Sequence, residues 1–180
     1  MNAVKNILIL GGESTGKSTL ASALARHYQT VFVPEYARTY LDELNAPYVE
    51  NDLLFIAQAQ LALEEALREE AHQFLFCDTG LDVLAVWSQH RYGRVDPFIL
   101  NGPLANSYDA ILVTAPDFPW EADPQREHPK EEDRLYFFAW YEQIAMASNK
   151  PYAIIEGEGA ARVEQAIAFL THTFQEPHAD

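Results

Sequence analysis

Short apolar runs alternate along the chain with longer stretches in which apolar residues recur every three or four positions. The apolar runs predict five strands, at Asn6–Leu10, Val31–Val33, Phe74–Cys77, Ala110–Thr114 and Tyr152–Ile155. The longer stretches predict helices over Lys17–Tyr28, Ala37–Leu44, Asp52–Glu70, Leu81–Tyr92, Glu131–Ser148 and Ala160–Phe174. Strands that alternate with helices in this way are typical of a parallel sheet with crossover helices. We therefore predict an α/β fold with helices on both faces of a five-stranded parallel sheet.

The helix predicted over Asp52–Glu70 has a distinctive start and a distinctive end. Asn51 precedes it and is a suitable N-cap, because its side chain can accept a hydrogen bond from a free backbone N–H. Near the other end, acidic residues run from Glu64 to Glu70. We interpret this acidic run as a solvated face of the helix.

Residues 11–18 read Gly-Gly-Glu-Ser-Thr-Gly-Lys-Ser and match the phosphate-binding loop pattern G-x-x-x-x-G-K-[ST] between the first strand and the first helix. The glycines let the backbone wrap closely around an anion, and the helix N-terminus adds positive potential. Lys17 is expected to reach the β- and γ-phosphates of ATP, and the Ser18 hydroxyl to ligate Mg²⁺. The residues expected to bind the nucleotide here are Gly11, Glu13, Ser14, Thr15, Gly16, Lys17, Ser18 and Thr19. The motif narrows the predicted fold to the three-layer sandwich of P-loop nucleoside triphosphate hydrolases and kinases.

Length and charge limit the classes of partner. The 180 residues, 48% of them hydrophobic, suit one compact domain over residues 1–180. A formal net charge of −15 repels nucleic-acid phosphates and anionic lipids, so neither nucleic acid nor a membrane is an expected partner. The single cysteine, Cys77, excludes an internal disulfide and is interpreted as an inert core thiol. No apolar run is long enough for a signal peptide or a membrane span, which predicts a soluble cytoplasmic enzyme.

Acidic residues stand at the carboxyl ends of the second and third predicted strands, where ligands of parallel sheets gather. Glu35 is expected to face the acceptor and to take a proton from a hydroxyl or hold metal-bound water. Arg38 lies three residues later on the same side of the next helix, and a purely structural ion pair with Glu35 is the alternative. Asp78 is expected to orient Mg²⁺ beside Ser18, or else to cap the following helix. Whether Glu35 or Asp78 is the base stays open.

A proline-rich segment separates the fourth strand from the helix that begins at Glu131. Its four prolines within residues 115–129 exclude a continuous helix or an interior strand. Loops of this length in compact domains are usually functional or disordered. We interpret residues from about 115 to 130 as a lid that closes over the triphosphate, with Arg126 as the cation that reaches the transferring phosphoryl group. A surface excursion without this role is the alternative.

Further candidates flank these segments. Aromatic side chains that could stack on a flat acceptor ring, with ordinary packing as the alternative for each, are Tyr36, Trp87, Tyr92 and Trp120. After the last strand, Gly157 and Gly159 permit close approach to a planar ligand, so adenine is expected there with Arg162 over its ring, or else a simple turn. No zinc site is expected, because zinc-ligand spacing is missing among His27, His72, His90, His128, His172 and His178.

Several of these segments together resemble the nicotinamide riboside kinase (ribosylnicotinamide kinase) family, including the kinase domain of bifunctional NAD-biosynthesis proteins. The matching stretches follow in the expected order and are Gly11–Leu20, Val33–Arg38, Asp78-Thr79, Trp87-Ser88 and, within Ala115–Glu127, Trp120, Asp123 and Arg126. The second and last of these stretches discriminate best, because the P-loop is shared by many enzymes. Gly80 and Gln125 depart from the pattern, where an acidic residue and a leucine are expected.

The resemblance implies ATP- and Mg²⁺-dependent phosphorylation of the ribose 5′-hydroxyl of nicotinamide riboside, a small-molecule nucleoside, to nicotinamide mononucleotide. It places Glu35 and Asp78 where the acceptor and metal residues of the family lie, and Arg126 in the lid. The residues that it implies for acceptor binding are Glu35, Tyr36, Arg38, Asp78, Trp87, Trp120 and Asp123. No adenylyltransferase or DNA-binding segment accompanies these motifs, so we expect a stand-alone kinase.

Two other functions are compatible with the same residues. A kinase for another nucleoside or small hydroxyl compound would use every catalytic residue named above. A regulatory P-loop ATPase would instead hydrolyse ATP slowly and without any response to a nucleoside. The sequence leaves open the oligomeric state and the preference for ATP over GTP.

Overall fold

A computed structural model describes residues 3–44, 46–101 and 107–174, so His178, one of the histidines named above, lies outside the described residues. The strands form one sheet in the order β2-β3-β1-β4-β5, and all neighbouring strands are parallel. Their bounds are β1 Lys5–Leu10, β2 Phe32–Val33, β3 Phe74–Asp78, β4 Ala110–Thr114 and β5 Tyr152–Ile155. The predicted five-stranded parallel sheet of P-loop type is therefore confirmed.

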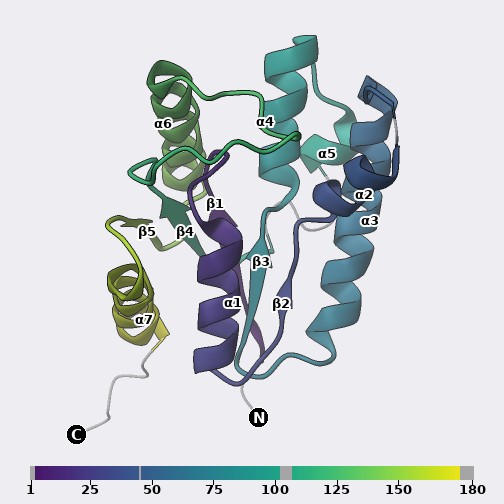
Figure 1. Cartoon of the computed structure of the whole chain (residues 1–180). Coiled ribbons are helices and arrows are strands. Elements are labelled where there is room, and N and C mark those ends of the chain that lie inside the picture. The colour runs from purple at the N-terminus through teal and green to yellow at the C-terminus, as the bar shows by residue number, and fades with distance from the viewer. Residues whose placement is uncertain (1–2, 45, 102–106, 175–180) are drawn as a thin grey trace, which may run out of the picture.

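Helices connect these strands on both sides of the sheet (Figure 1). Their bounds are α1 Lys17–His27, α2 Tyr36–Leu44, α3 Glu50–Arg68, α4 Leu81–Tyr92, α5 Pro97–Asn101, α6 Glu131–Ala147 and α7 Ala160–Phe174. The short helix α5 was not predicted, because five residues are too few to show a helical period. Its start does carry a local signal, since the Phe98 N–H donates to the Asp96 side chain at 2.8 Å and Pro97 occupies the first turn. None of the described helices combines the length and the hydropathy that crossing a membrane requires.

Successive residues of the central strand β1 enter two different cores. Ile7 and Ile9 pack with α1 and α7 on one face of the sheet. Leu8 and Leu10 pack on the other face, where α3, α4 and α6 supply the partners. A strand that is buried on both faces reads as a continuous apolar run, which is why the pattern before the P-loop has no polar alternation. The result is the three-layer arrangement visible in Figure 1.

Helix α3 corrects two expectations. Val49 rather than Asn51 occupies the N-cap, and the Asp52 carboxylate accepts the Val49 N–H at 2.7 Å. Within the acidic run, Glu64 is only 2% exposed, and its two carboxylate oxygens lie 3.1 and 3.2 Å from the Tyr108 hydroxyl. Burial raises the pKa of Glu64 to about 7. Only the remaining acids of the run, Glu65, Glu69 and Glu70, form the exposed face that we predicted.

Gly80 makes room for this buried contact. A Cβ at position 80 would lie 2.6 Å from the Tyr108 hydroxyl oxygen, closer than real Cβ atoms approach. An acidic side chain at this position, as the family pattern suggests, would displace Tyr108 from Glu64. The departure at Gly80 and the buried Glu64–Tyr108 pair are therefore parts of one arrangement.

Candidate active site

The P-loop connects β1 to α1 at the carboxyl edge of the sheet. Gly16 has a φ of 76° and Ser14 a φ of 56°, so the loop passes twice through the left-handed region before the helix begins. Gly11 is required by space, because a Cβ there would lie 2.0 Å from the Thr114 hydroxyl oxygen on β4. Left-handed residues of this kind allow a loop to curl so that its backbone N–H groups can face an anion.

Side-chain hydrogen bonds hold the P-loop in this conformation. The Thr15 and Thr114 hydroxyl oxygens are 2.7 Å apart, and Thr114 also donates to the Leu10 carbonyl at 3.1 Å. Thr15 and Thr114 are both buried, so these bonds are shielded from water. The Lys17 ammonium donates to the Gly12 carbonyl at 3.0 Å, which holds the lysine across the loop that it follows. Ser18 and Thr19 are exposed at the start of α1.

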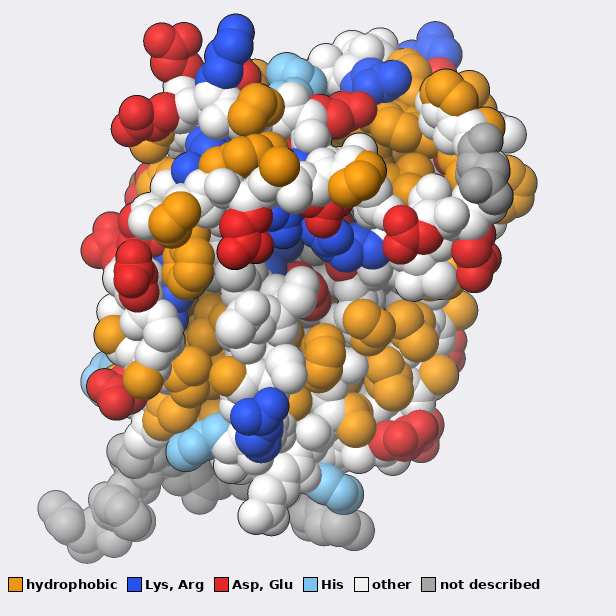
Figure 2. Space-filling model, in the orientation of Figure 1, with side chains coloured by type: hydrophobic (Ala, Val, Ile, Leu, Met, Phe, Trp, Pro, Cys, Tyr) orange, Lys and Arg blue, Asp and Glu red, His pale blue; other side chains and the backbone are white. Residues whose placement is uncertain are grey.

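A cavity of about 830 Å³ opens from the P-loop toward α2, α4, α6 and the segment between β4 and α6. It is large enough for two small ligands side by side, since ligand pockets range over about 300–1,000 Å³. Figure 2 shows Lys and Arg side chains gathered in the hollow of this face, with Asp and Glu around it. The cations that line the cavity are Lys17, Arg38, Arg91, Arg126 and Arg134. In a chain of strongly negative net charge, this cavity therefore brings five cations together, beside the carboxylates of Glu13, Glu35, Glu121 and Glu127.

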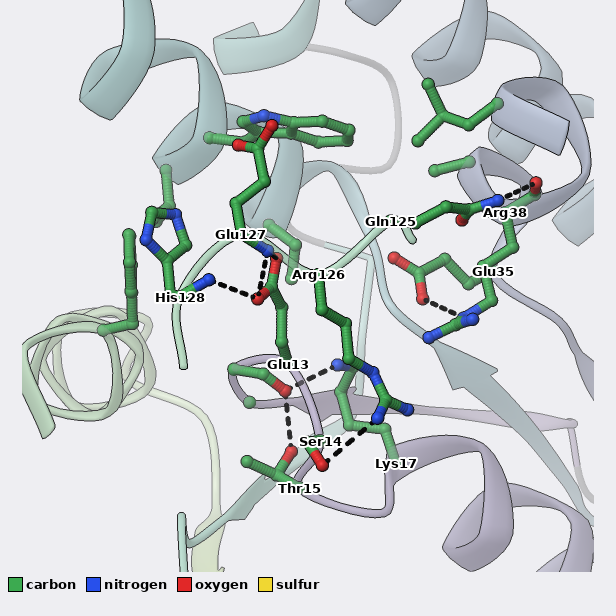
Figure 3. A pocket seen from close by; sticks show the side chains of 18 of the residues that line it. Glu13, Ser14, Thr15, Lys17, Glu35, Arg38, Gln125, Arg126, Glu127 and His128 are labelled. Carbon is green, nitrogen blue, oxygen red and sulfur yellow. Dashed lines mark hydrogen bonds and ion pairs between the residues drawn. The ribbon is translucent and has the colours of Figure 1, made fainter. Parts of the chain in front are cut away.

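Glu35 and Arg38 both line the cavity from the end of β2 and the start of α2 (Figure 3). The Arg38 Nε lies 3.8 Å from a Glu35 oxygen, and its NH1 donates to the Asp123 carboxylate at 3.0 Å. The ion pair that we weighed as the alternative therefore forms, and Arg38 also ties Asp123 of the lid segment to α2. The Gln125 N–H and Arg38 lower the pKa of Asp123.

The pKa of the Glu35 carboxyl is raised, chiefly because burial removes water from it. Asp78 and Glu13 act in the same direction through their charges, whereas Lys17 and Arg38 oppose the shift. A carboxyl with a raised pKa beside two cations is a suitable proton acceptor.

Asp78 ends β3 beside the P-loop strand. It pairs with Ile9 in the sheet, two residues before the loop begins. The residue is 1% exposed, and its Oδ1 atom has no hydrogen-bond partner. An unpaired buried carboxylate oxygen is costly, so it marks a position where a ligand or water completes the bonding.

The segment 115–130 lies directly over the P-loop and crosses from β4 to α6 (Figure 1). The Arg126 NH1 donates to the Ser14 hydroxyl at 3.3 Å and to the Glu121 carbonyl at 2.5 Å. Ser14 also accepts the Glu121 N–H at 3.1 Å and contacts the Pro119 carbonyl at 3.3 Å. The structure therefore brings the predicted lid and the P-loop together, with Arg126 between them.

Arg162 does not occupy the position that we expected. Its guanidinium is 4.6 Å from the centroid of the Phe118 ring and donates to the carbonyls of Thr15, Ala115 and Gly157 at 2.5, 2.9 and 2.7 Å. It also pairs with Asp117, and the residue is 3% exposed. A side chain so enclosed is not available to cover an adenine ring in this arrangement. Arg162 instead binds the P-loop to the loops that follow β4 and β5.

The aromatic candidates separate into two groups. Trp87 lines the cavity, and its indole N–H donates to the Tyr48 hydroxyl at 2.7 Å. Tyr36 and Tyr92 pack against the core between α2, α3 and α4. Trp120 also lies outside the cavity lining, and the Arg126 Cζ is 6.0 Å from its ring centroid. The structure therefore favours Trp87 as the ring-stacking residue over the other three.

Residues 6–162 match a protein family described as an AAA domain. The chain belongs to this family. The chain is also 31% identical over 140 residues to the trifunctional NAD biosynthesis/regulator protein NadR of Salmonella typhimurium. This match covers 74% of the chain and 34% of that protein. NadR of Escherichia coli is 29% identical over 161 residues, with coverage of 86% and 39%. The chain thus spans less than two fifths of the length of these relatives.

Solved structures agree with this family membership at the level of the fold. The AAA-domain chain superposes on NadR in complex with NAD and AMP-PNP with a TM-score of 0.77 at 21% identity, covering 99% of this chain and 52% of that one. NadR in complex with NR gives a TM-score of 0.75 at 24% identity, with coverage of 99% and 54%. Deoxyadenosine kinase from M. mycoides gives 0.56 at 13% identity, with coverage of 93% and 99%. The fold is that of P-loop kinases, and the chain is related to NadR.

Several residues of this AAA-domain site have no signal in the sequence pattern. Tyr48 stands between two helices, and its hydroxyl accepts from Trp87 while its ring lies 4.3 Å from the Arg91 guanidinium. His90 and His128 face each other with ring centroids 5.4 Å apart, and both line the cavity. These residues come from three separate segments, namely the α2–α3 connection, α4 and the segment between β4 and α6, so only the tertiary fold brings them together.

Proposed function

We propose that the chain transfers the γ-phosphoryl group of ATP to the ribose 5′-hydroxyl of nicotinamide riboside and so produces nicotinamide mononucleotide. The observation that carries this proposal is one cavity with a P-loop at one end and a Trp87–Tyr48 aromatic wall at the other, with Glu35 on its lining. The relatedness to NadR, a protein of NAD biosynthesis that has been solved with NR, supports the choice of nucleoside.

The nucleotide end follows from the P-loop. Its backbone N–H groups and the N-terminus of α1 bind phosphate oxygens, and Lys17 exchanges its contact with the Gly12 carbonyl for the β- and γ-phosphates. The adenine ring lies near Gly157, whose φ of 83° keeps the backbone open after β5. Arg162 supports this end from beneath, through the Thr15 and Gly157 carbonyls.

The residues that would hold Mg²⁺ are Ser18 and Asp78. Their chemistry fits, because Ser18 is exposed at the mouth of the loop and the buried Asp78 Oδ1 has no other partner. When bound, Mg²⁺ would supply positive charge that neutralises the phosphates of the nucleotide. Asp78 acts by fixing the orientation of this centre from the end of β3, and Ser18 acts by presenting its hydroxyl from the first turn of α1.

The acceptor end uses the groups around Glu35. Glu35 orients the 5′-hydroxyl and takes its proton as the new bond to phosphorus forms, for which a carboxylate with a raised pKa is suited. Trp87 is the candidate for stacking on the positively charged nicotinamide ring, because it lines the cavity. Tyr48, whose ring already faces the Arg91 guanidinium at 4.3 Å, holds Trp87 in place through its hydroxyl. Arg38 lies 3.8 Å from Glu35 and also binds Asp123 at 3.0 Å, so Arg38 and Asp123 are the candidates for the ribose hydroxyls.

Arg126 completes the transfer site. Its guanidinium contacts Ser14 of the P-loop, so it approaches the position where charge develops on the transferring group. Such a cation stabilises the transition state more than the bound nucleotide, because the charge that it faces is greatest during transfer.

The test is ADP release from Mg·ATP with and without nicotinamide riboside, with phosphorylated nucleoside identified by mass. The proposal expects release that depends on nicotinamide riboside and is at least tenfold slower with adenosine, cytidine, uridine and thymidine. Equal or faster transfer to one of those nucleosides would assign a different acceptor. Slow ADP release that no nucleoside changes would instead indicate a regulatory ATPase.

A further inference from the structure

Glu13 places a carboxylate within the loop that is expected to bind triphosphate. It is the third residue of the P-loop pattern and lines the cavity, so its carboxylate adds negative charge close to where phosphates bind. Like charges at such distances repel, and the repulsion weakens nucleotide binding. The side chain therefore has a contact elsewhere that accounts for its position.

That contact is the backbone of the lid. The Glu13 carboxylate accepts the N–H of Glu127 at 3.0 and 3.2 Å and the N–H of His128 at 3.0 Å. Figure 3 shows the Glu13 side chain rising from the P-loop to these two consecutive N–H groups. Hydrogen bonds to a carboxylate are stronger than neutral ones, so this is the best-bonded point between the lid and the P-loop.

The same point determines the direction of Arg126. The backbone N–H of Arg126 donates to the Asp123 carbonyl at 3.0 Å, and the N–H of the following residue, Glu127, donates to the Glu13 carboxylate. Figure 3 shows the Arg126 side chain directed at the P-loop, whereas the Glu127 side chain points the opposite way along the cavity. Without the hydrogen bond from the Glu127 N–H to Glu13, the lid backbone would no longer keep the Arg126 and Glu127 side chains on opposite sides. The Arg126 guanidinium would then no longer be directed at Ser14.

We propose that Glu13 is a positioning residue, which holds the lid by the N–H groups of Glu127 and His128 and thereby keeps Arg126 over the transferring phosphoryl group. This inference rests on the proposed phosphoryl transfer for its effect on rate, but the contact itself is independent of the substrate. Glu13 acts through the backbone of the lid and does not touch the reacting atoms.

Amide hydrogen exchange tests the contact directly. In Glu13→Ala, the Glu127 and His128 amides should exchange about tenfold faster or more, because a charge-assisted bond protects each of them in the parent. Glu13→Gln keeps one acceptor oxygen without the charge and should fall between the parent and the alanine variant. Glu164→Gln, an exposed residue of α7 outside the cavity lining, is the matched control and should leave both amides unchanged.

Turnover tests the role in positioning. Glu13→Gln should lower kcat about tenfold without raising the KM for ATP, since it removes a like charge from the nucleotide end. In an Arg126→Ala background the same change should alter kcat by less than about twofold, because residues that act as a unit are not additive.

Each other outcome overturns a defined part of this inference. Unchanged exchange at Glu127 and His128 in Glu13→Ala would show that Glu13 does not hold the lid. Normal exchange combined with a higher KM for the nucleoside would make Glu13 an acceptor contact instead. A full tenfold loss in the Arg126→Ala background would mean that Glu13 acts independently of Arg126. If the parent phosphorylates no nucleoside, the proposed function fails, whereas the exchange result still decides whether the contact exists.

Discussion

A methyl group at position 11 would collide with the strand that lies beneath the P-loop. The Cβ of Gly11→Ala would lie 2.0 Å from the Thr114 hydroxyl oxygen and 2.8 Å from that of Thr15, and real Cβ atoms essentially never approach within 3.0 Å. The closer contact is therefore too short by at least 1.0 Å. Thr114 cannot move aside freely, because its hydroxyl bonds both Thr15 and the Leu10 carbonyl.

The magnitude follows from these bonds. Moving the Thr114 hydroxyl breaks two buried hydrogen bonds at about 1 kcal/mol each, and the added methyl group overpacks the site at about 2 kcal/mol. The variant should thus lose about 4 kcal/mol of unfolding free energy. For a chain of this size, that loss lowers the Tm by about 12 °C. Gly12→Ala is the matched control in the same loop, since nothing lies within 4 Å of a Cβ there, and its Tm should stay within about 3 °C of the parent.

Thermal unfolding followed by circular dichroism measures both variants, and a second substitution tests the cause. Thr114→Ala removes the hydroxyl that Gly11→Ala strikes most closely, so the double variant should lose clearly less than the sum of the two single losses. The 2.8 Å contact with the Thr15 hydroxyl and the φ of 156° at position 11 account for the loss that remains. The reasoning is refuted if Gly11→Ala melts like the parent, or if the double variant shows the sum of the two single losses.

The remaining predictions concern the chemistry of the site. Lys17→Ala should abolish transfer while the Tm stays unchanged, which activity and melting assays check together, and retained activity would remove Lys17 from the mechanism. Asp78→Asn should require more Mg²⁺ for half-maximal rate, whereas an unchanged Mg²⁺ titration would make Asp78 a structural residue. Arg126→Ala should lower kcat about 10²-fold or more with a smaller effect on ATP affinity, and the reverse pattern would place it in nucleotide binding. Burial raises the pKa of Glu35, so its carboxylate takes up a proton at a higher pH than an ordinary glutamate does. Turnover should therefore begin to fall at that higher pH as the solution is acidified. Glu35→Gln should be slow and should lack this acidic limb in a pH–rate profile.

Much of the fold could be predicted because the hydrophobic pattern of each segment agrees with the place that the segment takes in the folded chain. The three central apolar runs, which form β1, β3 and β4, are buried on both faces, so length and composition alone mark them as strands of a parallel sheet. The runs that form the edge strands β2 and β5 are only partly buried, but they are short and apolar in the same way. The P-loop could be predicted because its glycines and lysine are required by local geometry within eight residues.

The contacts across the site could not be predicted in the same way. Glu13 and His128 are 115 positions apart, and no periodicity reports that a carboxylate will meet two particular N–H groups at that separation. Glu64 was assigned to solvent because its neighbours are acidic, yet the fold places Tyr108 against it. Arg162 was expected above a ligand because it follows two glycines, whereas four acceptors from three loops enclose it.

The environment of Arg162 can be expressed as a count of donors. A guanidinium carries five N–H groups, and four acceptors surround it here: three backbone carbonyls and the Asp117 carboxylate. A lysine offers three N–H groups from a single nitrogen atom, so at least one buried acceptor would be left without a donor. Replacement of one cation by the other keeps the charge at this position but not the number or the directions of its bonds. Arg162→Lys is therefore a severe substitution, because it would disturb the loops that follow β1, β4 and β5 together.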